Sequence, residues 1–334
     1  MVSSREIVLV ERPVGAPTPA IFALRHVDVG PPAPGQVQVR NEWMSIDPSM
    51  RGRMYDRKSY VPPFQLGQPL EGRAVGRVVA SHAPEFAEGD IVGSGLGWRE
   101  YFNAPASALT RLDTRGMPPR AFLDVAGSSG LTAYVGLFHI AGLKEGDVVF
   151  VSSAAGAVGS MVCQYAKLKG HKVIGSAGSS RKIAYLKDEL GVDEAINYKA
   201  EPSLTKALAR VAPDGIDVYF DNVGGSHLEA ALANANRFGR FALCGMISTY
   251  NLIEPAAGPR NIMLAVTKDL NLRGFIVANH RQHEPAFLND IEKWYSEGKI
   301  KRKETIYEGI ESSVEALINL FEGAGIGKTL VKIS

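Results

Sequence analysis

The chain has 334 residues, of which 45% are hydrophobic and 22% are charged, and its formal net charge is +2 at pH 7. This length allows two domains with substantial cores. The balanced charge gives no sign of a nucleic-acid partner, and no apolar stretch is long enough to cross a bilayer. We therefore expect a soluble, cytoplasmic protein with neither nucleic acid nor membrane among its partners.

The first 120 residues are rich in glycine and proline. They contain short β-type runs, such as residues 36–40 and 72–80, separated by clusters of turn-forming residues. This texture is typical of an all-β barrel.

After about residue 120 the pattern changes to strands that alternate with helices, which predicts a doubly wound parallel sheet. A helical pattern covers residues 157–169 and another covers 284–297. The last segment contains an amphipathic helix near residues 313–321 and a final strand, 329–333, that could return to pair with the N-terminal barrel. The predicted strands of the sheet are residues 147–152, 172–176, 194–197, 216–221, 238–244 and 271–277.

The turn after the first of these strands is the most informative segment. It reads Ala154-Ala155-Gly156-Ala157-Val158-Gly159 and opens directly into a helical pattern. Gly156 and Gly159 allow backbone N–H groups to approach a pyrophosphate at the positive end of that helix. Ala154 replaces the first glycine of the usual G-x-G-x-x-G pattern. The alternative is that the glycines serve only close packing of strand and helix.

The next strand is followed by Ala177-Gly178-Ser179-Ser180-Arg181-Lys182. A dinucleotide fold presents here the group that meets the adenosine ribose, and an acidic residue would select NAD. Two hydroxyls and two cations without a carboxylate suit a 2′-phosphate instead. The segment therefore predicts NADP(H) as the cofactor, and the alternative is a pair of solvated cations in the first turn of a helix.

Two cysteines and seven histidines bear on disulfide and metal chemistry. Cys163 lies in a helical pattern and Cys244 ends an apolar strand, which are common places for small buried thiols. We expect no disulfide and no metal site. The histidines are interpreted as surface or satisfied residues; they are His26, His82, His139, His171, His227, His280 and His283.

Six blocks, in order from residue 46 to the C-terminus, carry a family resemblance. They are Ile46-Asp47-Pro48-Ser49-Met50-Arg51-Gly52-Arg53-Met54, Gly130-Leu131-Thr132-Ala133-Tyr134, the 154–159 turn, Asp221-Asn222-Val223-Gly224-Gly225, Ile247-Ser248-Thr249-Tyr250-Asn251 and Gly327-Lys328-Thr329-Leu330-Val331. Together they resemble the zinc-independent medium-chain reductases that saturate conjugated double bonds: prostaglandin reductases (leukotriene 12-hydroxydehydrogenases), plant alkenal reductases and bacterial curcumin reductases. Residues 51–54 and 59–63 look most like the curcumin-reductase branch.

The resemblance implies an α/β protein with a GroES-like β-barrel catalytic domain, residues 1–120 and 300–334. A doubly wound (Rossmann) NADP(H)-binding domain would cover residues 121–299, and the protein would be a homodimer. The implied reaction is NADPH-dependent reduction of the carbon–carbon double bond of an α,β-unsaturated ketone or aldehyde. Hydride goes to the β-carbon, the carbonyl becomes an enolate that needs a hydrogen-bond donor, and the α-carbon is then protonated.

A tyrosine hydroxyl suits the donor role, because it is protonated at neutral pH and its ring gives it a rigid position. Two tyrosines match family positions proposed for this work. We expect Tyr250 to be the oxyanion donor or proton source, since loops beyond the carboxyl ends of parallel strands bind ligands. Tyr60 is the second candidate. The alternative for each is an aromatic side chain that only lines the cleft.

The resemblance also implies the residues that hold the cofactor. Thr132 and Asn222 match positions beside the nicotinamide and its ribose, and Lys182 and Tyr198 match positions that hold the 2′-phosphate. Tyr198 could instead be an aromatic cap over the sheet edge, and residues 275–277 could be an ordinary buried strand. The full expected set is Thr132, Ala154, Gly156, Ala157, Val158, Gly159, Gly178, Ser179, Lys182, Tyr198, Asn222, Phe275, Ile276 and Val277.

Three departures from the family pattern bear on affinity and specificity rather than on reaction class. Ser49 stands where many relatives have a tyrosine, which implies a roomier or more polar pocket wall. Ser128 replaces a methionine that flanks the nicotinamide, and Gly325 replaces an asparagine near the cofactor.

Other functions remain open at this stage. A zinc alcohol dehydrogenase would need about three cysteine or histidine ligands, and the chain lacks that arrangement. A quinone reductase of the same architecture also uses NADPH without metal, although the Tyr250 loop and the 221–225 block favour alkene reduction. The non-enzyme alternative is an NADPH-binding scaffold or sensor without turnover.

Overall fold

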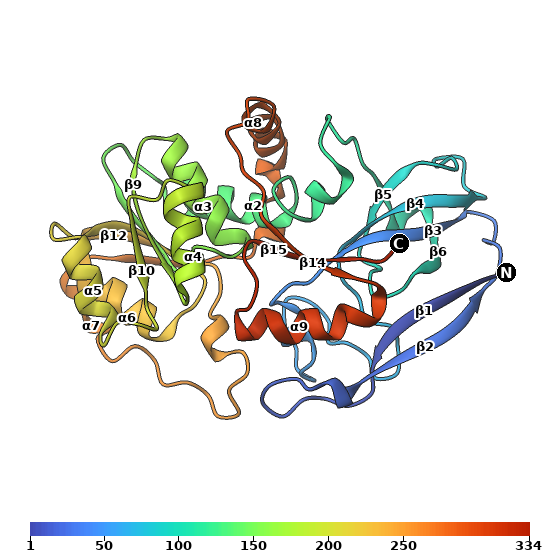
Figure 1. Ribbon diagram of the computed structural model, residues 1–334, viewed down its shortest axis with the longest axis horizontal. Coiled ribbons are helices and arrows are strands. Elements are labelled where there is room, and N and C mark those ends of the chain that lie inside the picture. Colours follow the sequence, from blue (N-terminus) through green and yellow to red (C-terminus); the bar gives the residue numbers. More distant parts are fainter. The chain divides into compact units, whose positions relative to one another are not determined.

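The computed structural model describes all 334 residues. The chain forms two compact units. Unit 1 comprises residues 1–124 and 304–334, and unit 2 comprises residues 125–303. The first and last parts of the chain therefore belong to one unit, while unit 2 is a single continuous segment (Figure 1).

Unit 1 is built on a seven-stranded sheet with the order β14-β15-β3-β4-β5-β7, in which β6 also pairs with β3. A separate antiparallel pair, β1 and β2, completes its strands. The strands are β1 (Val2–Leu9), β2 (Phe22–Val29), β3 (Gln36–Ser45), β4 (Ala74–Ser81), β5 (Ile91–Ser94), β6 (Tyr101–Pro105), β7 (Thr110–Arg111), β14 (Glu304–Glu308) and β15 (Lys328–Lys332), and the helices are α1 (Met50–Arg53) and α9 (Ser313–Glu322).

The C-terminal strand β15 lies between β14 and β3 and pairs antiparallel with β3. This confirms the predicted return of the final strand to the N-terminal sheet. An ion pair reinforces the junction, since the buried Lys328 Nζ lies 2.6 Å from Oδ1 of the half-buried Asp47, just beyond β3. Asp47 also accepts a 2.6 Å hydrogen bond from the Ser45 hydroxyl.

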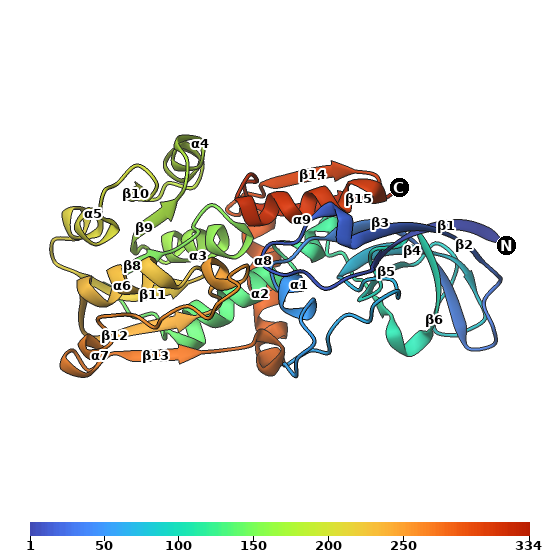
Figure 2. The ribbon, with the colours of Figure 1, turned by 90° about the horizontal axis from the view of Figure 1, so that it is seen from below.

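Unit 2 has a six-stranded, all-parallel sheet with the order β10-β9-β8-β11-β12-β13 (Figure 2). The order reverses between β8 and β11, which makes their carboxyl ends the switch point where such folds bind ligands. The predicted doubly wound fold is confirmed. The strands are β8 (Val148–Val151), β9 (Lys172–Ala177), β10 (Glu194–Asn197), β11 (Ile216–Asp221), β12 (Ala235–Leu243) and β13 (Asn271–Gly274). The helices are α2 (Ser128–Tyr134), α3 (Ala157–Leu168), α4 (Ser180–Ala184), α5 (Leu204–Val211), α6 (Gly225–Asn234), α7 (Met263–Thr267) and α8 (Glu284–Ser296).

The central strands of unit 2 are buried on both faces. Val149, Phe150 and Val151 in β8 have no exposed surface, as expected for a continuous apolar run in a parallel sheet. The ring of Tyr219 stacks on Phe150 at 5.2 Å between centroids and meets Phe241 edge-on at 5.3 Å. This packing holds the carboxyl ends of β8 and β11 in a fixed geometry.

The last strand is shorter than the expected span of residues 271–277. It ends at Gly274, and Val277 begins a 3-10 segment, Val277–His283. The reason is tertiary: the Phe275 ring turns inward and packs edge-on against Phe220, with centroids 6.3 Å apart. Gly136 makes room for both rings, because a Cβ atom there would lie 2.4 Å from Phe220 and 2.7 Å from Phe275.

None of the helices combines the length and the apolar character that crossing a bilayer requires.

Candidate functional site

The turn after β8, which the sequence predicts as a dinucleotide site, packs tightly against the start of α3. Gly156 is the residue before α3 and has an extended backbone. A Cβ atom on Gly159 would lie 2.3 Å from the Ser153 carbonyl oxygen, so only glycine fits there. Ser153 itself has a positive φ of 48°, a tight conformation for a non-glycine residue. The first N–H groups of α3, from Ala157 onward, are left at the helix end, and a helix end of this kind can bind an anion.

Ala154 can replace the first motif glycine because the neighbouring strand β9 leaves space for its side chain. Its side chain is buried, and its Cβ lies 2.9 Å from the position that a Cβ on Gly175 would take. The absence of a side chain at Gly175 in β9 provides the space that Ala154 uses. The departure from the usual motif is thus accommodated within unit 2.

Several cations gather at the carboxyl end of β9, where the sequence predicts the 2′-phosphate. Ser179 caps α4, and its Oγ accepts a 3.4 Å hydrogen bond from the Lys182 backbone N–H. Burial lowers the pKa of the Lys182 ammonium, and the like charges of Arg181 and Lys199 lower it further. A group of cations that repel one another in this way is suited to hold a dianion.

Tyr198 lies beside these cations at the end of β10. A Cβ atom on Gly178 would lie 3.0 Å from the Tyr198 hydroxyl oxygen and 3.2 Å from Lys199 Cε. The phenol therefore leans over Gly178, and a side chain at that position would displace it. Lys199 was missed by the sequence reasoning, although its place directly after Tyr198 at a strand end was an available signal.

The 221–225 block forms a turn that is fixed to the end of β8. The Asp221 carboxylate accepts hydrogen bonds from the N–H groups of Val223 at 2.9 Å and Gly224 at 2.8 Å. Asn222 donates to Ser152 twice, from its side-chain amide to the carbonyl oxygen at 2.8 Å and from its backbone N–H to the hydroxyl at 2.9 Å. Asn222 is thereby placed beside the glycine turn at the switch point.

The buried Asp221 carboxyl is electrostatically unusual. Burial raises its pKa, while hydrogen bonds from Gly224, Tyr219 and Val223 oppose that rise without cancelling it. The Tyr219 hydroxyl donates to Asp221 at 2.7 Å, and burial raises the pKa of that phenol well above its ordinary value. These groups form the rigid support of the turn, and Asn222 carries its polar side chain at the margin.

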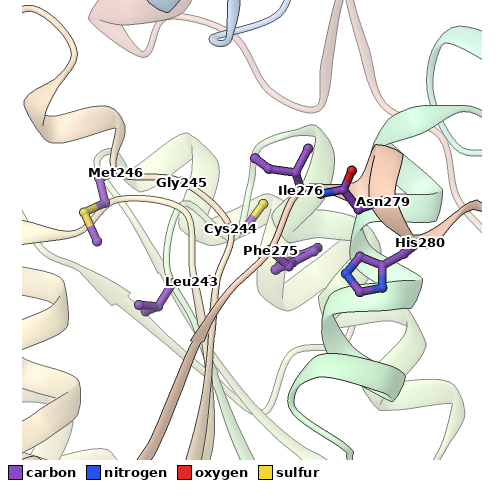
Figure 3. A pocket seen from close by; sticks show the side chains of 9 residues that line it. Leu243, Cys244, Gly245, Met246, Phe275, Ile276, Asn279 and His280 are labelled. Carbon is purple, nitrogen blue, oxygen red and sulfur yellow. The ribbon is translucent and has the colours of Figure 1, made fainter. Parts of the chain in front are cut away.

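A cavity of about 490 Å³ opens at the carboxyl ends of β12 and β13 (Figure 3). Its lining is mostly apolar and includes Cys244, Phe275 and Ile276. Two polar side chains, Asn279 and His280, also face it, and the sequence reasoning assigned neither of them to a site. Such a pocket, apolar with a few polar groups, is the usual form of a small-molecule site. Val277 follows this lining in the 3-10 segment.

Tyr250 lies at the margin of this cavity. It follows a 3-10 turn, Ile247–Thr249, and is half-buried. Its hydroxyl oxygen lies 3.1 Å from the position of a Cβ on Gly245, which lines the cavity. The loop after β12 therefore brings this phenol next to the pocket wall. Thr132 is half-buried in α2, also in unit 2.

The second candidate tyrosine belongs to unit 1. Tyr60 is 60% exposed in the connection from α1 to β4. Arg12 holds the ends of this loop together by donating to the carbonyl oxygens of Met54 at 3.0 Å and Phe64 at 3.2 Å. Arg53 adds a 2.9 Å hydrogen bond to the Pro62 carbonyl oxygen.

Two of the three departures from the family pattern also lie in unit 1. Ser49 stands directly before α1. Gly325 packs closely on Thr305, because a Cβ atom there would lie 3.0 Å from the threonine hydroxyl oxygen. An asparagine at 325 would have to displace that side chain. Ser128, the third departure, is the first residue of α2 in unit 2.

The histidines and cysteines show one difference from expectation. No three or more His, Cys, Asp or Glu side chains are grouped so as to hold a metal ion. Cys163 and Cys244 are free thiols, and burial raises the pKa of Cys244 to about 12. His171 is satisfied by a 3.2 Å hydrogen bond to the Asp147 carbonyl oxygen. The interpretation of all histidines as surface or satisfied residues is wrong for His227, whose Nε2 is buried without a hydrogen-bond partner.

Comparison with known proteins identifies relatives along the whole chain. Residues 5–112 match the family model described as the N-terminal domain of oxidoreductase, and residues 157–293 match the model described as zinc-binding dehydrogenase. The 2-alkenal reductase (NADP(+)-dependent) of Nicotiana tabacum is 40% identical over 100% of this chain and 98% of its own length. The NADPH-dependent curcumin reductase of Escherichia coli is 38% identical over 99% and 97%, respectively.

Among solved structures, CurA from Vibrio vulnificus in complex with NADPH superimposes with a TM-score of 0.94. The two chains are 40% identical, and the match covers 99% of each. The chain therefore belongs to the medium-chain dehydrogenase/reductases, in the family that includes the alkenal, curcumin and prostaglandin reductases.

Proposed function

We propose that this protein is an NADPH-dependent reductase that saturates the carbon–carbon double bond of α,β-unsaturated ketones and aldehydes. The observation that carries the proposal is the cavity at the ends of β12 and β13, with the Tyr250 phenol at its margin. Its apolar lining suits an enone or enal chain, and a phenol suits the carbonyl oxygen. Relatives named as alkenal and curcumin reductases support the substrate class.

The cofactor would be held by unit 2. The N–H groups after Gly156 would bind the pyrophosphate, and Lys182 with Tyr198, Ser179 and Gly178 would bind the 2′-phosphate. Gly159 and Gly178 support this arrangement because a Cβ atom at either position would press on the site itself, on the Ser153 carbonyl oxygen or on the Tyr198 hydroxyl oxygen. When bound, NADPH supplies the hydride. Residues 121–299 would thus form the NADP(H)-binding domain, and residues 1–120 and 300–334 the catalytic domain; the observed units change at 124/125 and 303/304.

The remaining residues would orient the nicotinamide and the substrate and supply the proton that the α-carbon receives. Asn222, fixed by Ser152, would hold the ribose next to the nicotinamide, with Thr132 and the 275–277 backbone along the ring. The Tyr250 hydroxyl would donate to the substrate carbonyl oxygen as negative charge develops there, and would then supply the proton for the α-carbon. Tyr60 is the second candidate for that donor. No step in this scheme uses a protein metal ligand.

We also propose that the working form is a cytoplasmic homodimer. β13 is an edge strand of the parallel sheet, paired only with β12, and its residues Asn271, Arg273 and Gly274 are exposed. Two large apolar side chains of the neighbouring helix α7 are also exposed, Met263 at 66% and Val266 at 68%. An edge of this kind is a template for pairing with a second copy. Light scattering on the intact protein and on the Val266→Asp variant tests this: a monomeric wild type contradicts it.

A substrate panel tests the proposed reaction. The protein is mixed with NADPH and either 3-nonen-2-one, the saturated ketone nonan-2-one, or a quinone, and loss of reduced-cofactor absorbance is followed. We expect turnover with the enone, a saturated ketone as the product identified by mass spectrometry, and no turnover with nonan-2-one. Turnover of the quinone alone would identify a quinone reductase. Binding of NADPH without turnover of any compound would support the scaffold or sensor.

A further inference from the structure

His227 packs against the part of unit 2 that is proposed to hold the 2′-phosphate. It lies in the first turn of α6 and is only 2% exposed. Its ring meets the Tyr198 ring edge-on, with centroids 4.8 Å apart and an angle of 77° between the planes. The packing of α6 on the sheet thus brings a second ring against a phenol that follows β10.

The contact acts through ring packing alone. The Nε2 atom of His227 has no hydrogen-bond partner. Burial lowers the pKa of the imidazole to about 4, so the ring is neutral at physiological pH and adds no charge to the nearby cations. Edge-to-face pairs of this geometry stabilise a ring orientation beyond the area they bury. His227 therefore restricts where the Tyr198 phenol can lie.

The hydroxyl end of the same phenol lies close to Gly178. The Tyr198 hydroxyl oxygen lies 3.0 Å from the site of a Cβ on Gly178, at the turn that leads to Lys182. If the phenol lost its support from α6, it could rotate away from this turn. A hydroxyl that donates to a phosphate oxygen must be held within hydrogen-bonding distance, so its orientation bears directly on phosphate affinity.

We infer that His227 is a positioning residue for cofactor selection: its ring holds the Tyr198 phenol over Gly178 and so favours NADPH over NADH. This inference rests on the cofactor of the proposed function. It assigns selectivity to a residue in α6, outside the segment that carries the phosphate-binding cations. It also predicts that the aromatic ring, and not the imidazole nitrogen, is what matters.

Two variants of similar volume test the inference. His227→Leu fills the space without a ring, whereas His227→Phe keeps the ring and removes the unpartnered nitrogen. Affinities for NADPH, NADH and adenosine 2′,5′-bisphosphate are measured by calorimetry on the full chain. His171→Leu is the matched control, because His171 is also buried but lies at the other end of β9, bonded to Asp147.

We expect His227→Leu to weaken the binding of NADPH and adenosine 2′,5′-bisphosphate by about 2- to 12-fold, and to leave the affinity for NADH unchanged. His227→Phe should bind all three probes like the wild type and should melt at a higher temperature, since a buried unsatisfied atom is removed. The control should lose thermal stability and keep all three affinities. At saturating NADPH, His227→Leu should keep the wild-type kcat.

Equal weakening of NADPH and NADH in His227→Leu would show general loosening and overturn the inference. So would unchanged affinities, or a His227→Phe variant as impaired as His227→Leu. Because adenosine 2′,5′-bisphosphate binds without turnover, the result does not depend on whether the protein reduces an enone. Failure of the proposed reaction would be seen separately, in the substrate panel.

Discussion

The ion pair between the half-buried Asp47 and the buried Lys328 makes a quantitative prediction about acid stability. Burial by itself raises the pKa of Asp47, but the charges of Lys328 and Arg73 and hydrogen bonds from Lys328 and Ser45 outweigh it. The result is a pKa of about 2 instead of the ordinary 3.8. A carboxyl whose pKa falls on folding stabilises the folded state above its unfolded pKa, and loses that contribution as the pH falls toward the folded value.

The magnitude follows from this shift. A difference of about 1.8 pKa units corresponds to about 2.4 kcal/mol at pH 7. With the same two pKa values, linkage gives about 1.3 kcal/mol at pH 3. Asp47→Asn removes the titrating group, so the difference in unfolding free energy between wild type and variant should shrink by about 1.1 kcal/mol from pH 7 to pH 3.

Urea unfolding of both proteins across this pH range measures that difference, and all other carboxyls cancel in the comparison. Lys328→Met should be costlier at pH 7, by about 3 kcal/mol, because it leaves the half-buried Asp47 carboxylate without its main cation. The double variant should lose less than the sum of the two single variants. A difference between wild type and Asp47→Asn that stays constant from pH 7 to pH 3 would refute the reasoning.

Three further predictions concern the candidate site. Lys182→Ala should raise the KM for NADPH by about 10- to 100-fold and leave the KM for NADH unchanged, because a charged hydrogen bond to the 2′-phosphate is lost. Steady-state kinetics with both cofactors measure this, with the exposed Lys206→Ala as the control, and equal effects on both cofactors would contradict the assignment. Tyr250→Phe should lower kcat by about 100-fold or more while NADPH affinity stays the same, since its hydroxyl acts on developing charge; an unchanged kcat would transfer the donor role to Tyr60 or to water. Gly159→Ala should destabilise unit 2 by about 1 to 3 kcal/mol, because the Cβ of the alanine would lie 2.3 Å from the Ser153 carbonyl oxygen. A thermal melt identical to that of the wild type would show that the turn relaxes freely.

The regular parts of unit 2 could be predicted because their signals are local. The helix expected at residues 157–169 is observed at Ala157–Leu168, and the strand expected at 194–197 is observed at those residues. In each case an apolar run or a helical periodicity is bounded by turn residues. The overall fold was predicted from this alternation of strands and helices, and the family from the six sequence blocks between residue 46 and the C-terminus.

Features that depend on contacts between distant segments could not be predicted. The strand expected to reach Val277 ends at Gly274 because Phe275 finds space beside Gly136, more than a hundred residues earlier. The contact of the His227 ring with Tyr198 likewise joins residues that are 29 positions apart in the sequence. A single sequence carries no periodic signal for such encounters.

The polar lining of the cavity was missed for a related reason. Asn279 and His280 lie in a 3-10 segment after β13, where no motif marks them. Their approach to the cavity depends on the strand ending early. Whether they select among substrates can be read from the same enone panel with Asn279 and His280 variants.

The return of β15 to the N-terminal sheet has a consequence for synthesis on the ribosome. Unit 2 is one continuous stretch and can fold as soon as it has emerged, whereas unit 1 lacks the strand between β3 and β14 until residues 328–332 have been made. The edge of β3 therefore stays uncovered until then, and a chain that stops before Lys328 would leave that edge permanently open to other chains.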